Sequence, residues 1–331
     1  MYQGFESTQM NQAGIEMKWT PEQVRGQIPP LSMELLGKDM PDLINVYNQY
    51  YGLDLETKFI GLQHVVGTFD AAEFNISGHL FALPEAKGTV LLVHGYYDHV
   101  GIYNHIIEHC LSQGFNVFSY DLPGHGLSSG ERAAIDSFRQ YDQVFCAALD
   151  WVQTALPEPL VVIGQSTGGA VIINYLLSRG INKTNSPFAN IFLMAPLVRP
   201  VDWKLSKLFY YLARPFVKQL KREFAQNSHN LDFLSFISTS DPLQPLFLKT
   251  NWVGALKKWI KFIEASEPVD LNIHVIQGTQ DGTVDYRHNM LVLEDKFTGF
   301  DVTFVEQGRH HLANEEPIKL QQVLSAMTPL V

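Results

Sequence analysis

Short apolar runs alternate with longer amphipathic stretches through the middle of the chain. Near-continuous runs of Val, Ile, Leu and Phe are typical of strands covered by helices on both faces. This alternation predicts an α/β protein with an open, mostly parallel, doubly wound sheet, in which ligands bind at the carboxyl ends of the strands. The runs lie at 89–95, 115–124, 160–166, 190–196, 272–278 and 301–308, and the helical stretches at 102–112, 135–155, 169–178, 285–297 and about 316–327.

Three segments depart from this alternation. Residues 64–83 predict two or three strands joined by polar turns, an antiparallel start to the same sheet. Residues 1–60 show no chemistry and contain one candidate helix, at about 41–51. Residues 199–265, called the insertion below, are helix-like, aromatic and basic. We therefore expect an N-terminal extension at 1–60, a core built from 61–198 and 266–331, and an inserted helical cap at 199–265.

Composition narrows the class of protein. The 331 residues are 46% hydrophobic and 18% charged, which excludes a disordered or low-complexity chain. The net charge of −10 makes nucleic acid an unexpected partner. Cys110 and Cys146 show no zinc or disulfide spacing, so we expect buried thiols in a reducing compartment. No apolar run reaches 18 residues and the first 14 residues lack signal-peptide features, so a soluble, cytoplasmic protein is expected.

The sequence Gly164-Gln165-Ser166-Thr167-Gly168 follows an apolar run and opens a helical stretch. A GxSxG motif between a strand and a helix is typical of a nucleophile elbow, a sharp turn that exposes a serine hydroxyl above the sheet. Small residues two positions before and after the serine are needed because the turn leaves no space for larger side chains. We therefore predict Ser166 as a nucleophile.

A serine hydroxyl needs a base, and the base needs an orienting acid. Asp281 follows the run at 272–278 and His310 follows the run at 301–308, so both should lie at the same sheet edge as Ser166. The alternative acid, Asp285, falls where a helix begins and is better interpreted as an N-cap. The alternative base, His311, is better interpreted as a solvated or packing histidine.

An oxyanion hole needs two N–H donors, one from the residue after the nucleophile and one from a loop after an earlier strand. The backbone N–H groups of Thr167 and Tyr96 are the candidates, and Tyr97 is a candidate substrate-binding residue. His94 and His99 are expected to hold this loop through hydrogen bonds. We expect neither a metal site nor a cofactor.

The segments HGYYDH, DLPGHGLSSGER, GQSTGG, GTQDGTV and GRHHLANE, in this order, resemble the monoacylglycerol lipase and lysophospholipase branch of the α/β-hydrolases, the serine aminopeptidase-like group. The resemblance covers about 64–330. It implies a hydrolase of single-acyl lipid esters with nucleophile Ser166, base His310 and orienting acid Asp281. It also implies a helical cap between the sixth and seventh sheet strands. The elbow here has Gln-Ser-Thr where many members have His-Ser-Met, and the first 60 residues exceed what typical members carry.

The sequence alone is also compatible with other functions. The same serine chemistry would serve a broad carboxylesterase, an amidase or a peptidase, and proteins of this fold can bind ligands without turnover. The insertion has 11 basic and 5 acidic residues, so it carries +6 while the remainder carries −16. Its aromatic residues either form, with its lysines, a surface for membranes or micelles, or simply pack the cap onto the core.

Overall fold

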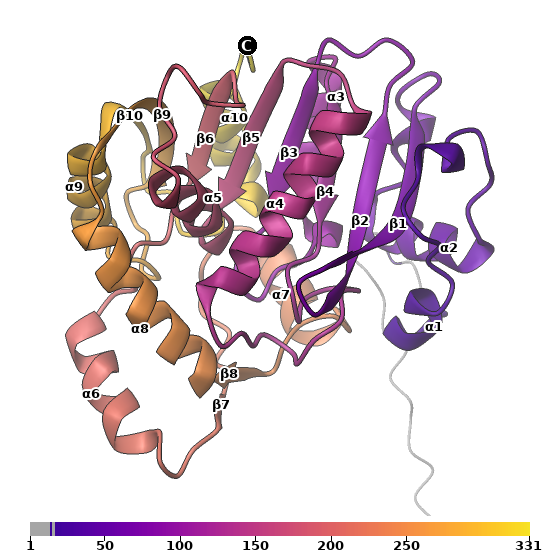
Figure 1. Cartoon of the computed structure of the whole chain (residues 1–331). Helices are drawn as coiled ribbons and strands as arrows, with labels where there is room; N and C mark the ends of the chain where they lie inside the picture. Colours follow the sequence, from indigo (N-terminus) through magenta and orange to yellow (C-terminus); the bar gives the residue numbers. More distant parts are fainter. Residues whose placement is uncertain (1–13, 15–16) are drawn as a thin grey trace, which may run out of the picture.

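The structure is a computed structural model that describes residues 14 and 17–331. An eight-stranded sheet crosses the molecule in the order β1-β2-β4-β3-β5-β6-β9-β10 (Figure 1). Only the pairs β1 with β2 and β2 with β4 are antiparallel, so the predicted mostly parallel sheet with an antiparallel start is confirmed. The strands are β1 Gln63–Ala71, β2 Phe74–Ala82, β3 Thr89–Val93, β4 Asn116–Tyr120, β5 Leu160–Gln165, β6 Asn190–Met194, β9 Val269–Gly278 and β10 Phe297–Val305.

Helices cover both faces of the sheet. Along β3, Leu91 and Val93 join one hydrophobic core, whereas Val90 and Leu92 join the other, as the two-residue period of a strand requires. The first core includes residues of α4 Phe138–Ala155, α5 Thr167–Ser178, α8 Thr250–Ala265 and α9 Tyr286–Lys296. The second includes residues of α1 Pro21–Arg25, α2 Asp42–Tyr51, α3 Asn104–Ser112, α7 Leu231–Thr239 and α10 Pro317–Ala326.

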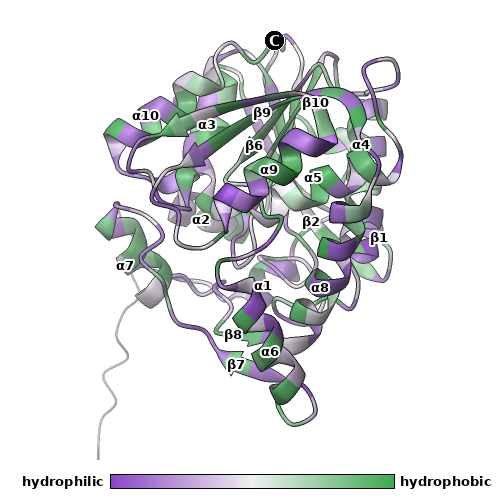
Figure 2. Cartoon of the chain, turned by 90° about the vertical axis from the view of Figure 1, so that its left-hand side faces the viewer, coloured by the Kyte–Doolittle hydropathy of each residue, from purple (hydrophilic) through white to green (hydrophobic). Residues whose placement is uncertain are grey.

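The insertion lies between β6 and β9, the sixth and seventh strands of the sheet. It contains α6 Trp203–Ala213, α7 and α8, together with an antiparallel pair of short strands, β7 Gln219–Lys221 and β8 Phe247–Lys249. This pair was not expected from the sequence, because three residues are too few to show a strand period. α6, β7 and β8 lie at the end of the molecule opposite the C-terminus (Figures 1 and 2).

The insertion meets the core along α8. Trp259 stacks on Phe138 with ring centroids 4.6 Å apart, and its indole N–H donates to Asn174. Trp252 stacks on Tyr96 at 3.8 Å. These tryptophans therefore pack α8 against the core, whereas α6 exposes several large apolar side chains to solvent: Leu205, Leu208, Phe209, Tyr211 and Leu212.

Part of the N-terminal extension packs on the second core. Trp19 and three tyrosines of α2 form one aromatic cluster, with ring centroids of neighbouring pairs 5.0 to 6.0 Å apart. The hydroxyls of Tyr50 and Tyr51 reach the insertion at Ser240 and Asp241. The N-terminal stretch in which a signal peptide was not expected, residues 1–14, lies almost wholly outside the described residues.

The two cysteines differ in burial. Cys110 is buried, as expected, but Cys146 is only half-buried, with the Arg179 guanidinium 3.1 Å from its sulfur. In the described part of the chain, no helix combines the length and the apolar character needed to cross a bilayer.

Candidate active site

Ser166 lies on a strained turn between β5 and α5. Its backbone has φ 52° and ψ −112°, a left-handed region that residues with a side chain rarely adopt. A Cβ on Gly168 would lie 2.1 Å from the Val93 carbonyl oxygen, and one on Gly164 would lie 2.7 Å from the Gly168 carbonyl carbon. Both positions of the motif therefore require glycine, because strand and helix approach each other too closely for any side chain.

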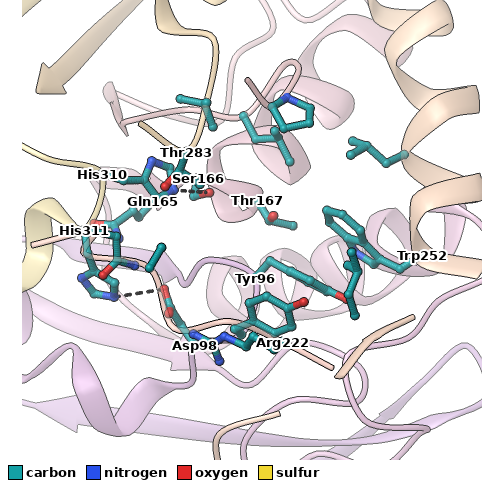
Figure 3. A pocket seen from close by; sticks show the side chains of 18 of the residues that line it. Tyr96, Asp98, Gln165, Ser166, Thr167, Arg222, Trp252, Thr283, His310 and His311 are labelled. Atoms are coloured by element: carbon teal, nitrogen blue, oxygen red, sulfur yellow. Dashed lines mark hydrogen bonds and ion pairs between the residues drawn. The ribbon is translucent and has the colours of Figure 1, made fainter. Parts of the chain in front are cut away.

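The three residues predicted from separate motifs lie together at the carboxyl edge of the sheet. His310 Nε2 is 2.9 Å from Ser166 Oγ, and His310 Nδ1 is 2.8 Å from Asp281 Oδ2 (Figure 3). The other Asp281 oxygen accepts the backbone N–H groups of Thr283 and Val284, which fixes the carboxylate. All three side chains are at least 91% buried, with Ser166 9% exposed.

The electrostatics of this pair favour a charged Asp281. Burial alone would raise the pKa of Asp281, but the facing His310 and the two backbone N–H donors lower it below its ordinary value. Burial alone would lower the pKa of His310, but the Asp281 carboxylate raises it above 6.5. An imidazole held between a hydroxyl and a carboxylate in this way can accept the hydroxyl proton and remain stabilised as an imidazolium.

The alternative acid and base have other contacts. Asp285 caps α9 by accepting the His288 N–H and pairs with the Arg199 guanidinium at 2.9 Å. His311 is buried, and its Nε2 lies 3.3 Å from Asp98 Oδ2. Neither side chain contacts Ser166 by a hydrogen bond in the described structure.

The loop after β3 lies beside the serine. Tyr97 has φ 72°, a second strained position near Ser166. The Tyr96 N–H forms no hydrogen bond with a described residue, and the Thr167 N–H lies in the first turn of α5, where amides have no acceptor within the helix. Both are therefore available to an oxygen bound above Ser166.

The two histidines of this loop form hydrogen bonds. His94 Nδ1 lies 2.7 Å from the Gly95 carbonyl oxygen, and its Nε2 accepts the Leu122 N–H. His99 Nε2 lies 2.9 Å from Asp241 of the insertion. In the part of the chain that the structure describes, no group of His, Cys, Asp and Glu side chains is arranged to hold a metal ion.

A cavity of about 340 Å³ opens above Ser166, within the size range of sites for small organic ligands. Tyr96, Tyr97, Thr167 and His310 contribute to its wall. Figure 3 shows Ser166 and His310 together on one side of the cavity in this view and Trp252 on the other. The insertion supplies much of the apolar lining: Trp203, Ile237, Leu248, Trp252, Val253 and Leu256.

Two charged groups of the cavity wall, Arg222 and Glu223, were not singled out from the sequence and were counted only among the charged residues of the insertion. Asp98, also in the wall, was considered with His94 and His99, and a role in holding the loop after β3 was preferred to zinc ligation. No local motif identifies Arg222, because it contacts residues more than 100 positions away, such as Tyr97. Only the fold brings it to the cavity.

Comparison with known proteins identifies the family to which the chain belongs. The family model described as serine aminopeptidase, S33, matches residues 84–317. Monoglyceride lipase of Homo sapiens is 30% identical over 239 residues, 70% of this chain and 77% of that protein. Monoacylglycerol lipase of Mycolicibacterium smegmatis is 30% identical over 92 residues, 28% of this chain and 33% of that protein. A match to an uncharacterized abhydrolase domain-containing protein of Dictyostelium discoideum spans 12% of that protein.

A solved structure extends the likeness to the fold. A soluble variant of monoglyceride lipase from Saccharomyces cerevisiae superposes with a TM-score of 0.66 at 16% identity, over 78% of this chain and 92% of that chain. The α/β-hydrolase fold predicted from the sequence is thereby confirmed.

Proposed function

Because the chain belongs to the serine aminopeptidase S33 family and to the monoacylglycerol lipase branch of the α/β-hydrolases, a group of lipase and esterase-type hydrolases, we propose that it hydrolyses single-acyl lipid esters through an acyl-serine intermediate. The observation that carries the proposal is the contact chain from Ser166 through His310 to Asp281. This contact chain places a serine hydroxyl and its base in the wall of one cavity, with the orienting carboxylate behind the base.

The proposed reaction has two halves. In the first, His310 Nε2 takes the Ser166 proton while Oγ attacks the ester carbonyl carbon, and the same proton then passes to the departing alcohol oxygen. In the second, water attacks the acyl carbonyl carbon while His310 takes its proton. His310 then gives this proton to Ser166 Oγ as the acyl–oxygen bond breaks, which releases the fatty acid and restores Ser166. Asp281 holds Nδ1 of the imidazole at 2.8 Å and stabilises its positive charge throughout.

The proposed oxyanion hole consists of the Tyr96 and Thr167 N–H groups. Their support is position: one belongs to the strained loop after β3 and the other to the first turn of α5, whose dipole also favours a negative charge. The tetrahedral oxygen would accept both N–H groups. The Tyr96 ring contributes indirectly, since stacking on Trp252 and a 2.7 Å hydrogen bond to the Ala133 carbonyl hold its backbone in place.

We also propose that residues 199–265 act as a cap that receives the acyl chain. Its support is the apolar lining that the insertion contributes above Ser166. A second surface of the same segment, on α6, exposes Phe209 at 60% and Leu212 at 64%, beside the exposed Lys204 and Arg214. We propose that this α6 surface contacts membranes or micelles that hold the substrate.

The test of the reaction is removal of the nucleophile. Ser166→Ala should abolish both hydrolysis of octanoylglycerol and labelling by a fluorophosphonate, because no other described hydroxyl contacts His310. The matched control is Ser206→Ala, since Ser206 lines the same cavity and should keep activity and labelling. Unchanged turnover in Ser166→Ala would overturn the proposal, and octanoyl anilide assayed in parallel distinguishes an amidase.

A further inference from the structure

A cation lies in the wall of the cavity that contains the serine. Arg222 directly follows β7 and lines this cavity, and its guanidinium lies over the Tyr97 ring at 4.0 Å and near the Phe224 ring at 4.4 Å. Because Tyr97 is the next residue after Tyr96, the guanidinium is anchored beside the loop of the proposed oxyanion hole. Figure 3 shows Arg222 next to Asp98 and Tyr96, on a different side of the cavity from Trp252.

The position of Arg222 is fixed by buried polar groups. Its Nη1 donates to Gln244 Oε1 at 2.7 Å and to the Pro245 carbonyl oxygen at 3.3 Å, and its backbone N–H donates to Leu246. Gln244 is held in turn by Asp241, which is buried at 8% exposure. The guanidinium is therefore oriented before any ligand arrives, which lowers the entropic cost of using it.

Two of the three guanidinium nitrogens have no hydrogen-bond partner among the described residues. Among residues 14 and 17–331, Nε and Nη2 form no hydrogen bond, and no carboxylate lies within 4.0 Å of Arg222. The nearest buried carboxylates are already engaged: Asp98 with His311 and the Tyr103 hydroxyl, and Asp241 with His99 and the Tyr51 hydroxyl. Glu223 also lines the cavity, but it is exposed and forms no ion pair with Arg222 among the described residues. The free N–H groups of this half-buried fork therefore fit an anionic ligand group.

We propose that Arg222 binds the phosphate of the alcohol part of the substrate, so that the substrates are single-acyl glycerophospholipids. This inference rests on the proposed function, ester hydrolysis at Ser166. The apolar lining near Trp252 suits the acyl chain, which leaves the side with Arg222 for the alcohol. The fatty-acid carboxyl group of such a lipid is esterified, so the phosphate is the anion that the alcohol part carries. A neutral monoacylglycerol would leave the charge of Arg222 unpaired.

The experiment compares two esters that differ only in the phosphate. Octanoylglycerol and octanoylglycerol 3-phosphate are assayed as monomers, below micelle formation, so that the basic surface of α6 plays no part. Arg222→Met should lower kcat/KM for the phosphate ester by roughly tenfold to a hundredfold, the range for hydrogen bonds to a charged group, and leave the neutral ester within about threefold. Arg222→Lys should fall between, because an ammonium cannot form the planar fork.

Two controls distinguish a direct contact between Arg222 and the phosphate from a general effect of positive charge and from a loss of folding. Lys221→Met removes the same charge from the neighbouring exposed position, which does not line the cavity, and should change neither ester. Retained hydrolysis of octanoylglycerol by Arg222→Met shows that this variant is folded. The carboxylate analogue 3-octanoyloxypropanoate is assayed as a third ester. The inference would be overturned if Arg222→Met lowered kcat/KM equally for both octanoylglycerol esters or for neither of them. It would also be overturned if kcat/KM fell only for the carboxylate analogue. Loss of all activity in Ser166→Ala tests the proposed reaction independently of these results.

Discussion

At the scale of single residues, the candidate nucleophile and the loop beside it include strained backbone positions. Ser166 and Tyr97 both have positive φ, a conformation that costs about 1–3 kcal/mol for each such residue. Backbone hydrogen bonds offset this cost on the serine turn, where Ser166 donates to Met194 and accepts from Leu197. The strain therefore points the hydroxyl and the neighbouring N–H groups at the cavity before a substrate binds.

The pH dependence of the reaction should reveal Asp281 through His310. The base must be neutral, and Asp281 raises its pKa above 6.5, so kcat/KM of the native enzyme should fall as pH drops through that raised value. In Asp281→Asn, no carboxylate at position 281 opposes the effect of burial, which lowers the pKa of His310. The acidic limb of the pH profile should therefore move to lower pH. The rate itself should fall by roughly ten-thousandfold, because the imidazole loses its orienting partner.

Profiles of kcat/KM against pH for octanoylglycerol measure this shift. The matched control is Asp285→Asn, which removes the alternative acid, a carboxylate that caps α9 and pairs with Arg199. Its acidic limb should coincide with that of the native enzyme. An unshifted limb in Asp281→Asn, or a shifted one in Asp285→Asn, would contradict the assignment.

The sequence could identify those residues that stand in a recognisable local motif. Ser166 directly follows the buried strand β5, and Asp281 and His310 lie in loops three and five residues after β9 and β10. The strand pattern alone therefore predicted that the three share one edge of the sheet. Arg222 follows a strand of only three residues, and its neighbours come from the loop after β3 and from residues near 244. No pattern along the chain predicts these contacts.

At the scale of elements, α2 ties the N-terminal extension to the insertion. The Tyr51 hydroxyl donates to Asp241 Oδ1 at 2.7 Å, and the same carboxylate faces His99 at 2.9 Å. One buried side chain thus joins the extension, the loop after β3 and the segment that holds Gln244. No chemistry was expected in residues 1–60, because a tyrosine on an amphipathic helix predicts only packing.

This link should contribute measurably to stability. Tyr51→Phe removes a buried hydrogen bond to a carboxylate, so it should lower the free energy of unfolding by about 1–3 kcal/mol. The matched control is Tyr47→Phe, since Tyr47 is equally buried in α2 but its hydroxyl has no hydrogen-bond partner in the described structure. That change should be neutral or stabilising. Urea unfolding of both variants measures the difference, and equal effects would show that Tyr51 acts by packing alone.

At the scale of the whole molecule, charge and apolar exposure are unevenly distributed. The net charge of −10 combines +6 in the insertion with −16 elsewhere. Within the insertion the two interpretations of its aromatic residues apply to different helices: the tryptophans of α8 are buried against the core, whereas the apolar residues of α6 are exposed. The α6 helix, which carries these exposed apolar residues, lies at one end of the molecule (Figure 2).

If this α6 surface contacts lipid, its apolar side chains should be needed for binding to vesicles but not for the reaction. Phe209→Ser with Leu212→Ser should weaken co-sedimentation with anionic liposomes at least roughly tenfold, since each buried apolar side chain contributes about 1.5–3 kcal/mol. Hydrolysis of monomeric octanoylglycerol should be unchanged. The matched control is Leu291→Ser with Ile318→Ser, which removes side chains that are 66% and 75% exposed on α9 and α10. Native binding should also weaken as salt screens the lysines; indifference to salt, or equal loss in both double variants, would contradict the lipid contact.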